Sequence, residues 1–294
     1  MRNDRESYRL MAAVAVGAVL LLAPGVGRAA DDEGPNRGII SLSITNDFTN
    51  TYMFRGIQQE RDGFIWQPYI DVGLTLWDHE DAPIRSVSLG MGVWNSFQSE
   101  KTLARDSGPS NLYETDFYPS LTVGLPGGFE TSIIYYAYTS PNGGFDTVQE
   151  VDFLVGYDDK DLLGRLAMSP TVTFAVETQG TSFGDTRGSF VGLGVEPTIW
   201  ASENEDAPVS ITFPMALGLS ISDYYEEAGR TDPTFGYLQW GLRVGMDLPF
   251  VPKEAGTWNL SVTGSGYYLG QTLKRANHGD QLQPQVVGSL AVSY

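Results

Sequence analysis

The carboxyl-terminal stretch Q-P-Q-V-V-G-S-L-A-V-S-Y, residues 283–294, alternates apolar or small side chains with polar ones up to its last residue. Such a strand has one apolar and one polar face, as in the closing strand of an outer-membrane barrel with lipid outside and a lumen inside. An edge strand of a soluble β-sandwich alternates in the same way, so the rest of the chain must decide between the two. In the barrel interpretation, the lipid-facing insertion signal comprises Val286, Leu290, Val292 and Tyr294.

The amino terminus predicts export. Arg2, Arg5 and Arg9 precede an apolar run over residues 10–23, and small residues follow at 27–29. This order predicts a signal peptide over residues 1–29, cleaved after Ala29, because the run is shorter than the ~20 apolar residues of a spanning helix. The chain contains no cysteine, which leaves no lipidation site at the new terminus and no disulfide framework.

The mature chain, residues 30–294, is strongly acidic. Removing residues 1–29 takes away four arginines and two acidic residues, which leaves 14 basic against 34 acidic residues and a net charge of −20. Nucleic acid is therefore excluded as a partner, because like charges repel and the sequence has no basic stripe. No linker or change in composition divides the mature chain, so we expect one domain, and no motif implies a cofactor.

Alternation with a period of two recurs about every twenty residues. Several of the alternating segments run for ten to thirteen residues, close to the ~9–11 that a tilted strand needs to cross the hydrocarbon and longer than the ~5–6 usual in globular proteins. The sequence therefore predicts an all-β fold, a single transmembrane antiparallel β-barrel of about twelve strands. The expected strands are residues 40–48, 66–76, 87–93, 117–125, 129–137, 151–157, 166–176, 191–199, 209–219, 238–248, 258–268 and 283–294.

The connections between these segments also alternate, with longer polar ones after each odd segment and mostly shorter Pro-, Gly- and Asp-containing ones after each even segment. An even strand number places both termini on one side, so we expect an outer-membrane location with both termini in the periplasm and the long loops outside. The expected partners are outer-membrane lipid, the barrel-assembly machinery and small solutes, and the sequence leaves the oligomeric state open.

Prolines fall inside the expected strands. Each proline removes one hydrogen-bond donor from the ladder, and a closed barrel has no free edge to tolerate the loss. We therefore expect bulges, or positions near the rim, at several of these sites. The six prolines are Pro68, Pro119, Pro170, Pro197, Pro214 and Pro284.

Residues 52–59 read Y-M-F-R-G-I-Q-Q, directly after S-I-T-N-D-F-T-N. This segment resembles the opening hairpin of the poorly characterised Gcw_chp or TorF-like family of bacterial outer-membrane proteins, whose pattern is S-x-Y-x-F-R-G-I-S-Q followed by P-x-x-Q-x-G. Matches to that pattern are Phe54, Arg55, Gly56, Ile57 and Gln59, with Pro68 and Gly73 as counterparts in the second strand, while Gln58 replaces the usual Ser. The resemblance implies an outer-membrane barrel, and it implies no substrate or reaction.

Strand parity places many acidic residues and few basic ones on the lumen side. A wall of fixed carboxylates concentrates cations and repels anions. The alternative is a sealed interior in which these groups pair with one another, because barrels of intermediate strand number lie between filled and water-filled interiors. The expected lumen-facing residues are Asp47, Arg55, Asp71, Glu114, Asp116, Glu130, Glu150, Asp152, Glu177, Glu196 and Arg243.

An enzyme is a weaker interpretation of the sequence. Only His79 and His278 could serve as a catalytic base, and neither has a serine at a telling spacing. The acidic stretches 202–206 and 158–161 lack the glycine-punctuated spacing of a calcium loop, so no metal site is expected. The sequence favours a porin-like channel for passive diffusion of small solutes with cation preference. A closed barrel with a structural or loop-mediated binding role is the alternative, and a lipid-modifying enzyme is third.

Overall fold

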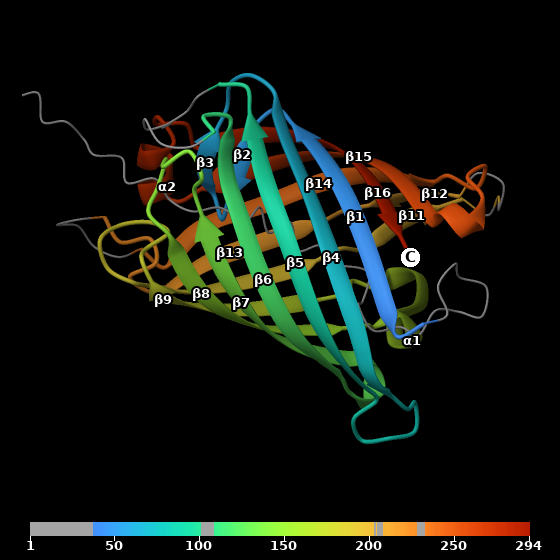
Figure 1. Ribbon diagram of the computed structural model, residues 1–294. Helices are drawn as coiled ribbons and strands as arrows, with labels where there is room; N and C mark the ends of the chain where they lie inside the picture. Colours follow the sequence, from blue (N-terminus) through green and yellow to red (C-terminus); the bar gives the residue numbers. More distant parts are fainter. Residues whose placement is uncertain (1–37, 101–108, 203, 205–207, 228–232) are drawn as a thin grey trace, which may run out of the picture.

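The computed structural model describes residues 38–100, 109–202, 204, 208–227 and 233–294, and the expected signal peptide lies outside them. Fourteen of the described strands form one antiparallel sheet that closes on itself, because the last strand pairs with the first (Figure 1). Two barrel strands are each interrupted once, so the fourteen segments of the sheet form twelve barrel strands. The segments are β1 (Ile40–Thr49), β4 (Ile65–Asp78), β5 (Ser86–Gln98), β6 (Leu112–Gly124), β7 (Phe129–Thr139), β8 (Val148–Tyr157), β9 (Thr171–Gln179), β10 (Ser189–Val195) continued by β11 (Thr198–Ala201), β12 (Val209–Thr212) continued by β13 (Met215–Ser222), β14 (Phe235–Asp247), β15 (Thr257–Leu269) and β16 (Leu282–Ser293).

The predicted single antiparallel barrel is thus confirmed. Its outer surface is apolar because alternate residues of each strand point away from the lumen. Ile70 and Val72 on β4 are 46% and 43% exposed, while Gln67 on the opposite face of the same strand is buried. Among the described residues no helix is long and apolar enough to span a membrane.

In the closing strand β16, alternate residues also face outward, but one residue expected to face lipid is buried. Val286 is 51% exposed and Tyr294 is 38% exposed, as the lipid-facing interpretation requires. Val292 lies on the same face but is only 8% exposed. Its strand neighbours Ile44 and Trp258 flank it, and the turn at Gly256 packs against it.

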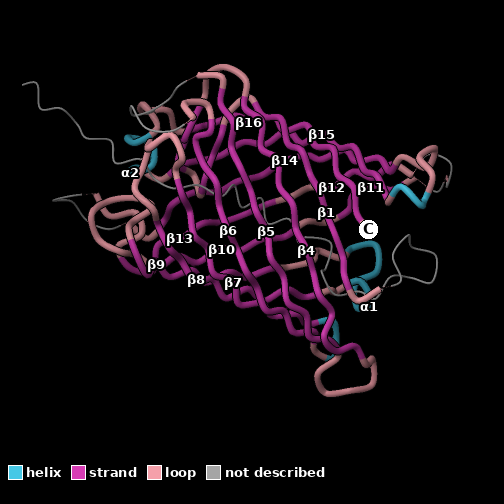
Figure 2. The backbone as a smooth tube through the Cα atoms, viewed as in Figure 1, coloured by secondary structure: helices cyan, strands magenta, loops and turns pink. Residues whose placement is uncertain are grey.

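The two ends of the barrel differ. Leu42 and Tyr294 bond to each other through their backbones, so both described termini lie at one rim, which we call the terminal end. The opposite rim, which carries the connections after β1, β5, β7, β9, β13 and β15, we call the hairpin end. Short helices lie near the rims, α1 (Lys160–Leu163) at the terminal end and α2 (Gln271–Ala276) at the hairpin end (Figure 2). Three 3-10 turns complete the elements, η1 (Pro126–Gly128), η2 (Gly164–Leu166) and η3 (Lys253–Ala255).

All six prolines lie where a ladder is interrupted or ends, although the pairing keeps its register across Pro68 and Pro119, where bulges were expected. Pro197 separates β10 from β11, and Pro214 separates β12 from β13. The β4–β5 pairing skips Pro68, and the β6–β7 pairing skips Pro119. Pro170 precedes the first residue of β9, and Pro284 lies beyond the last residue of β16 that pairs with β1.

Segment 166–176 is shorter as a strand than its alternation predicts. The strand β9 begins at Thr171, and α1 with η2 occupies residues 160–166. The cause is local, because the carboxylate of Asp159 accepts hydrogen bonds from the backbone N–H groups of Met168 and Ser169 at 3.0 and 2.9 Å. Those bonds hold the connection in a compact turn rather than in an extended strand.

Candidate functional site

In the connection 52–64, expected to be an outer loop, residues 52–60 fold back into the lumen. They form a separate two-stranded hairpin, β2 (Tyr52–Phe54) and β3 (Ile57–Glu60). Eight of its nine residues are buried, with Gln58 half-buried. Since loops normally lie in solvent, a buried loop signals a specific docking site inside the barrel. We call this hairpin, residues 52–60, the plug.

The tip of the plug is a two-residue turn formed by Arg55 and Gly56. Both have positive φ, 42° and 81°, as the type I′ turns that close tight hairpins require. Glycine adopts this conformation freely, whereas a positive φ is uncommon for arginine. Gly56 also lacks the space for a side chain, because an added Cβ would lie 2.7 Å from the Leu273 side chain. The turn therefore aims the Arg55 side chain at the barrel wall.

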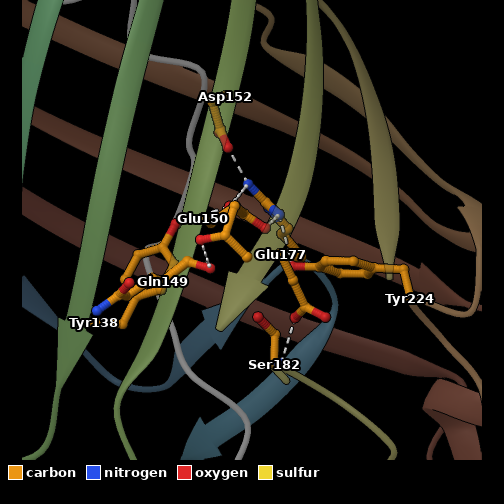
Figure 3. Close-up of polar contacts among 9 residues, drawn as sticks. Tyr138, Gln149, Glu150, Asp152, Glu177, Ser182 and Tyr224 are labelled. Atoms are coloured by element: carbon orange, nitrogen blue, oxygen red, sulfur yellow. Dashed lines mark hydrogen bonds and ion pairs between the residues drawn. The ribbon is translucent and has the colours of Figure 1, made fainter. Parts of the chain in front are cut away.

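The Arg55 guanidinium is held by an ionic cluster on β8. Nη1 and Nη2 donate to the two carboxylate oxygens of Glu150 at 2.8 Å each, and Nη2 also donates to Asp152 at 3.2 Å. The Arg55 side chain is 3% exposed and that of Glu150 is 0% exposed. Bidentate arginine–carboxylate pairs are strong and directional. Figure 3 shows Glu150 and Asp152 beside Tyr224, whose hydroxyl accepts a hydrogen bond from Arg55 at 2.6 Å.

Aromatic rings enclose this cluster. The guanidinium carbon of Arg55 lies 4.4 Å from the ring centre of Phe190, 5.1 Å from that of Phe54 and 5.3 Å from that of Tyr224. The Tyr225 hydroxyl donates to the Arg55 carbonyl at 3.0 Å. Rings exclude water while their faces attract the cation, so the ion pair lies in a medium that strengthens it.

A second set of contacts fixes the plug to β6. The Tyr52 hydroxyl donates to Glu114 at 2.9 Å, and the Tyr113 hydroxyl donates to Gln59 at 2.8 Å. Asp116, next inward on the same strand, is fully buried beside Glu114. The cationic tip thus binds one carboxylate pair, on β8, while a second carboxylate pair lies on β6.

The third set of contacts comes from α2 and its C-terminal turn. Asn277 donates to the Gly56 carbonyl at 2.7 Å and accepts from the Gln58 N–H at 2.9 Å. Gln285 of β16 donates to the Thr51 carbonyl at 2.9 Å. Since β6, β8 and β16 lie in different parts of the wall, the plug extends across the lumen at the hairpin end.

Below the plug, toward the terminal end, part of the lumen wall consists of small residues. Gly90 and Gly92 of β5 and Ser120 and Thr122 of β6 line an inner cavity. The hairpin half of the same strands carries Trp94 and Tyr113 instead. Bulky side chains and the plug fill the hairpin end, whereas small side chains leave space for a cavity below the plug.

All eleven residues expected in the lumen lie inside the barrel. Arg55, Glu150 and Asp152 form one cluster, and Glu114 and Asp116 line the opposite side of the plug. Glu177 binds the loop beside it, accepting from the backbone N–H groups of Ser182 and Gly188. Glu196 pairs with Arg243 beside the breaks at Pro197 and Pro214. The remaining three, separate from these clusters, are Asp47, Asp71 and Glu130.

Sequence reasoning missed the aromatic and amide partners of the plug, which include Tyr138, Tyr224, Tyr225 and Asn277. Tyr224, Tyr225 and Asn277 lie on connections expected to be solvated, and Tyr138 lies at the end of β7. The tyrosine pair at 224–225, inside a long polar connection, was the available signal, because large rings are uncommon in a solvated loop. Neither histidine joins the cluster, and no group of three potential metal ligands gathers within the described residues.

Replacing Gly56 should loosen the plug. Gly56→Ala places a side chain at a positive φ and against Leu273, so we expect the tip to leave its seat in part of the molecules. Trypsin should then cleave after Arg55, which is buried in the wild type, and mass spectrometry of the fragments measures this. The matched control is Gly127→Ala, which has φ +78° but nothing within 4 Å, and it should leave the site protected. Equal protection in both variants would contradict the tight seat.

Comparison with known proteins gives structural likenesses alone, since no family model and no curated protein matches the chain. The β domain of the Bordetella autotransporter BrkA is 10% identical, with a TM-score of 0.42, over 88% of this chain and 99% of that one. An outer-membrane channel from Pseudomonas putida is 11% identical, with a TM-score of 0.45, over 90% and 98%. The NanC porin is 13% identical, with a TM-score of 0.42, over 86% and 98%. At such identities the likenesses say nothing of what this chain binds.

Proposed function

We propose that this protein is a gated, cation-preferring outer-membrane channel for small solutes, and that the plug holds it closed. The carrying observation is the asymmetry of the lumen. Its hairpin half is filled by a separate hairpin attached at its tip by Arg55, whereas a cavity remains below that hairpin, lined in part by glycine, serine and threonine residues. A barrel sealed for structural reasons alone would be packed along its whole length, as small barrels are.

The membrane location rests on the outer surface. Apolar side chains cover the outward face of successive strands, as at Ile133, Phe153 and Val172, and a closed barrel leaves no unpaired backbone for lipid to face. With the short connections in the periplasm, the plug lies on the outer side of the membrane. The half of the lumen that contains the cavity then faces the periplasm. The segment that resembles the Gcw_chp or TorF-like family is the plug itself. We therefore also propose that this chain is a member of that family.

Cation preference follows from the charge of the lumen. Among the expected lumen residues nine are acidic and two, Arg55 and Arg243, are basic, and both arginines are already paired with carboxylates. The remaining fixed negative charge raises the local cation concentration and excludes anions. For a cation to cross the lumen, the plug must therefore move, whereas the barrel wall need not change.

Planar-bilayer recording tests the gate. Wild-type protein should show few or no conductance steps at low voltage. A variant with residues 52–60 replaced by a short Gly-Ser linker should conduct steadily, with a reversal potential on the cation-selective side in a salt gradient. Heat-modifiable migration on gels confirms that both are folded. Silence of the folded, plug-less variant would remove the channel proposal.

The second candidate is a closed barrel with a binding role at its hairpin end. The number of separate anchors favours it, since the plug is fixed to β6, to β8 and to the turn after α2. In that case the plug-less variant stays silent and less stable, because removing the hairpin exposes buried carboxylates without opening a path. The same recording thus separates the two candidates.

A further inference from the structure

The wall of the lumen below the plug contains a cavity of about 160 Å³, partly open to the interior. It lies between β4 and β8, and no contact of the plug described above involves its residues. The volume is smaller than the ~300–1,000 Å³ of pockets for drug-sized ligands, so it suits a molecule of a few heavy atoms.

Two carboxylates border this cavity, Asp71 from β4 and Glu130 from β7. Neither forms an ion pair with another described residue. A third carboxylate adjoins them, because Asp152 lies directly across the β7–β8 ladder from the lining residue Ile134. Asp152 is 5% exposed, and its Oδ1 has no hydrogen-bond partner among the described residues. A carboxylate beside the cavity adds to the attraction of Asp71 and Glu130 for a cation.

Aromatic and apolar groups form the rest of the lining. The rings of Tyr118 and Tyr136 lie 5.5 Å apart and both face the cavity, with Ile134 and Leu154 beside them. Ring faces attract ammonium and guanidinium groups, and apolar side chains accommodate a short hydrocarbon stem. A hydrated metal ion would use only the carboxylates, whereas an organic cation uses the whole lining.

Glycines form the opposite wall of the cavity. The Tyr118 ring and the Asp71 carboxylate lie close over Gly92, where any side chain would collide with both. Gly90 and Ser120 continue this wall with little bulk. Small residues at these positions keep the ring and the carboxylate side by side, which is the arrangement that a cation on an apolar stem requires.

We propose that this cavity binds a small organic cation, a short alkylammonium or guanidinium group, through Asp71, Glu130 and the rings of Tyr118 and Tyr136. The site deepens the proposed cation preference, because it places a selective cation site on the path just below the gate. It is formed with the plug in place, so binding is measurable in closed, non-conducting protein. A failure of binding and a failure of conduction are therefore separate results.

Saturation-transfer NMR on refolded protein in detergent tests the site with butylammonium chloride. Saturable binding is expected for butylammonium at constant ionic strength, and none for 1-butanol or sodium butyrate, which share the stem without the positive charge. Asp71→Asn and Glu130→Gln should each weaken binding roughly tenfold, as loss of a charge-assisted hydrogen bond does. The matched control Asp158→Asn, in the turn after β8, should bind like the wild type.

Tyr118→Leu separates the contribution of the ring from that of charge, and it should weaken butylammonium binding while leaving both carboxylates in place. Heat-modifiable migration shows that each variant is folded. Three results would overturn the site: no saturable binding by the wild type, equal binding of 1-butanol, or an unchanged dissociation constant in both carboxylate variants.

Discussion

Arg55→Ala should convert the silent barrel into a conducting one. Removing one partner of a buried ion pair costs about 3–5 kcal/mol, because the other charge stays buried without compensation. Here Glu150, 0% exposed, would lose both of its bonds to the guanidinium. Since each 1.4 kcal/mol is a factor of ten, the ratio of released to seated plug should rise by roughly two to four orders of magnitude. Planar-bilayer recording reads this directly as open probability at low voltage.

Two further variants identify the cause of the effect. Arg243→Ala removes the other expected lumen arginine, which pairs with Glu196 away from the plug, and it should stay closed. The double variant Arg55→Ala, Glu150→Ala should conduct less often than Arg55→Ala alone, because no uncompensated carboxylate then remains under the plug. An Arg55→Ala barrel that is folded and as silent as the wild type would contradict the role of Arg55 in holding the gate.

Much of the barrel could be predicted from the sequence because strand parity is a local signal. The alternation at Gln67 and Ile70 or at Val286 and Leu290 reports which face meets lipid without knowledge of the neighbouring strand. The same parity correctly placed Asp71 and Glu130 inside. It failed in one detail at Val292, because burial there depends on the turn at Gly256, which is distant in sequence.

The plug could not be predicted, since its fold depends on contacts between distant segments. Tyr52 and Phe54 lie in a connection that the alternation predicts to be an outer loop, and nothing local shows that Glu150, Tyr224 and Asn277 come together around it. The resemblance to the Gcw_chp or TorF-like family includes Arg55 and Gly56, but it does not give the conformation of the turn that they form. Positive φ at both positions, with arginine at one, marks a side chain aimed at a specific partner.

Leu290→Arg should prevent stable insertion. Leu290 is the ninth of the twelve residues of β16, where it pairs with Asn46 of β1 and Leu260 of β15, and Leu260 is 44% exposed on the same outer face. A basic residue on the lipid face near the bilayer midplane costs roughly 2–4 kcal/mol, which is a large part of the ~5–15 kcal/mol that stabilises a typical domain. Because β16 closes the barrel against β1, the cost falls on the closing seam. We expect strongly reduced heat-modifiable protein in the membrane fraction.

Two control variants separate the effect of changing residue 290 from the effect of adding a positive charge. Leu290→Val keeps the face apolar and should insert normally. Phe250→Arg places the same charge in the turn after β14, where Phe250 is 78% exposed and lies outside every strand, and it should also insert. Arginine at the buried neighbour Val292 would mix lipid exposure with loss of packing against Gly256, which is why Leu290 gives the cleaner test. Wild-type levels of heat-modifiable Leu290→Arg protein in the membrane would show that this face of β16 does not meet lipid.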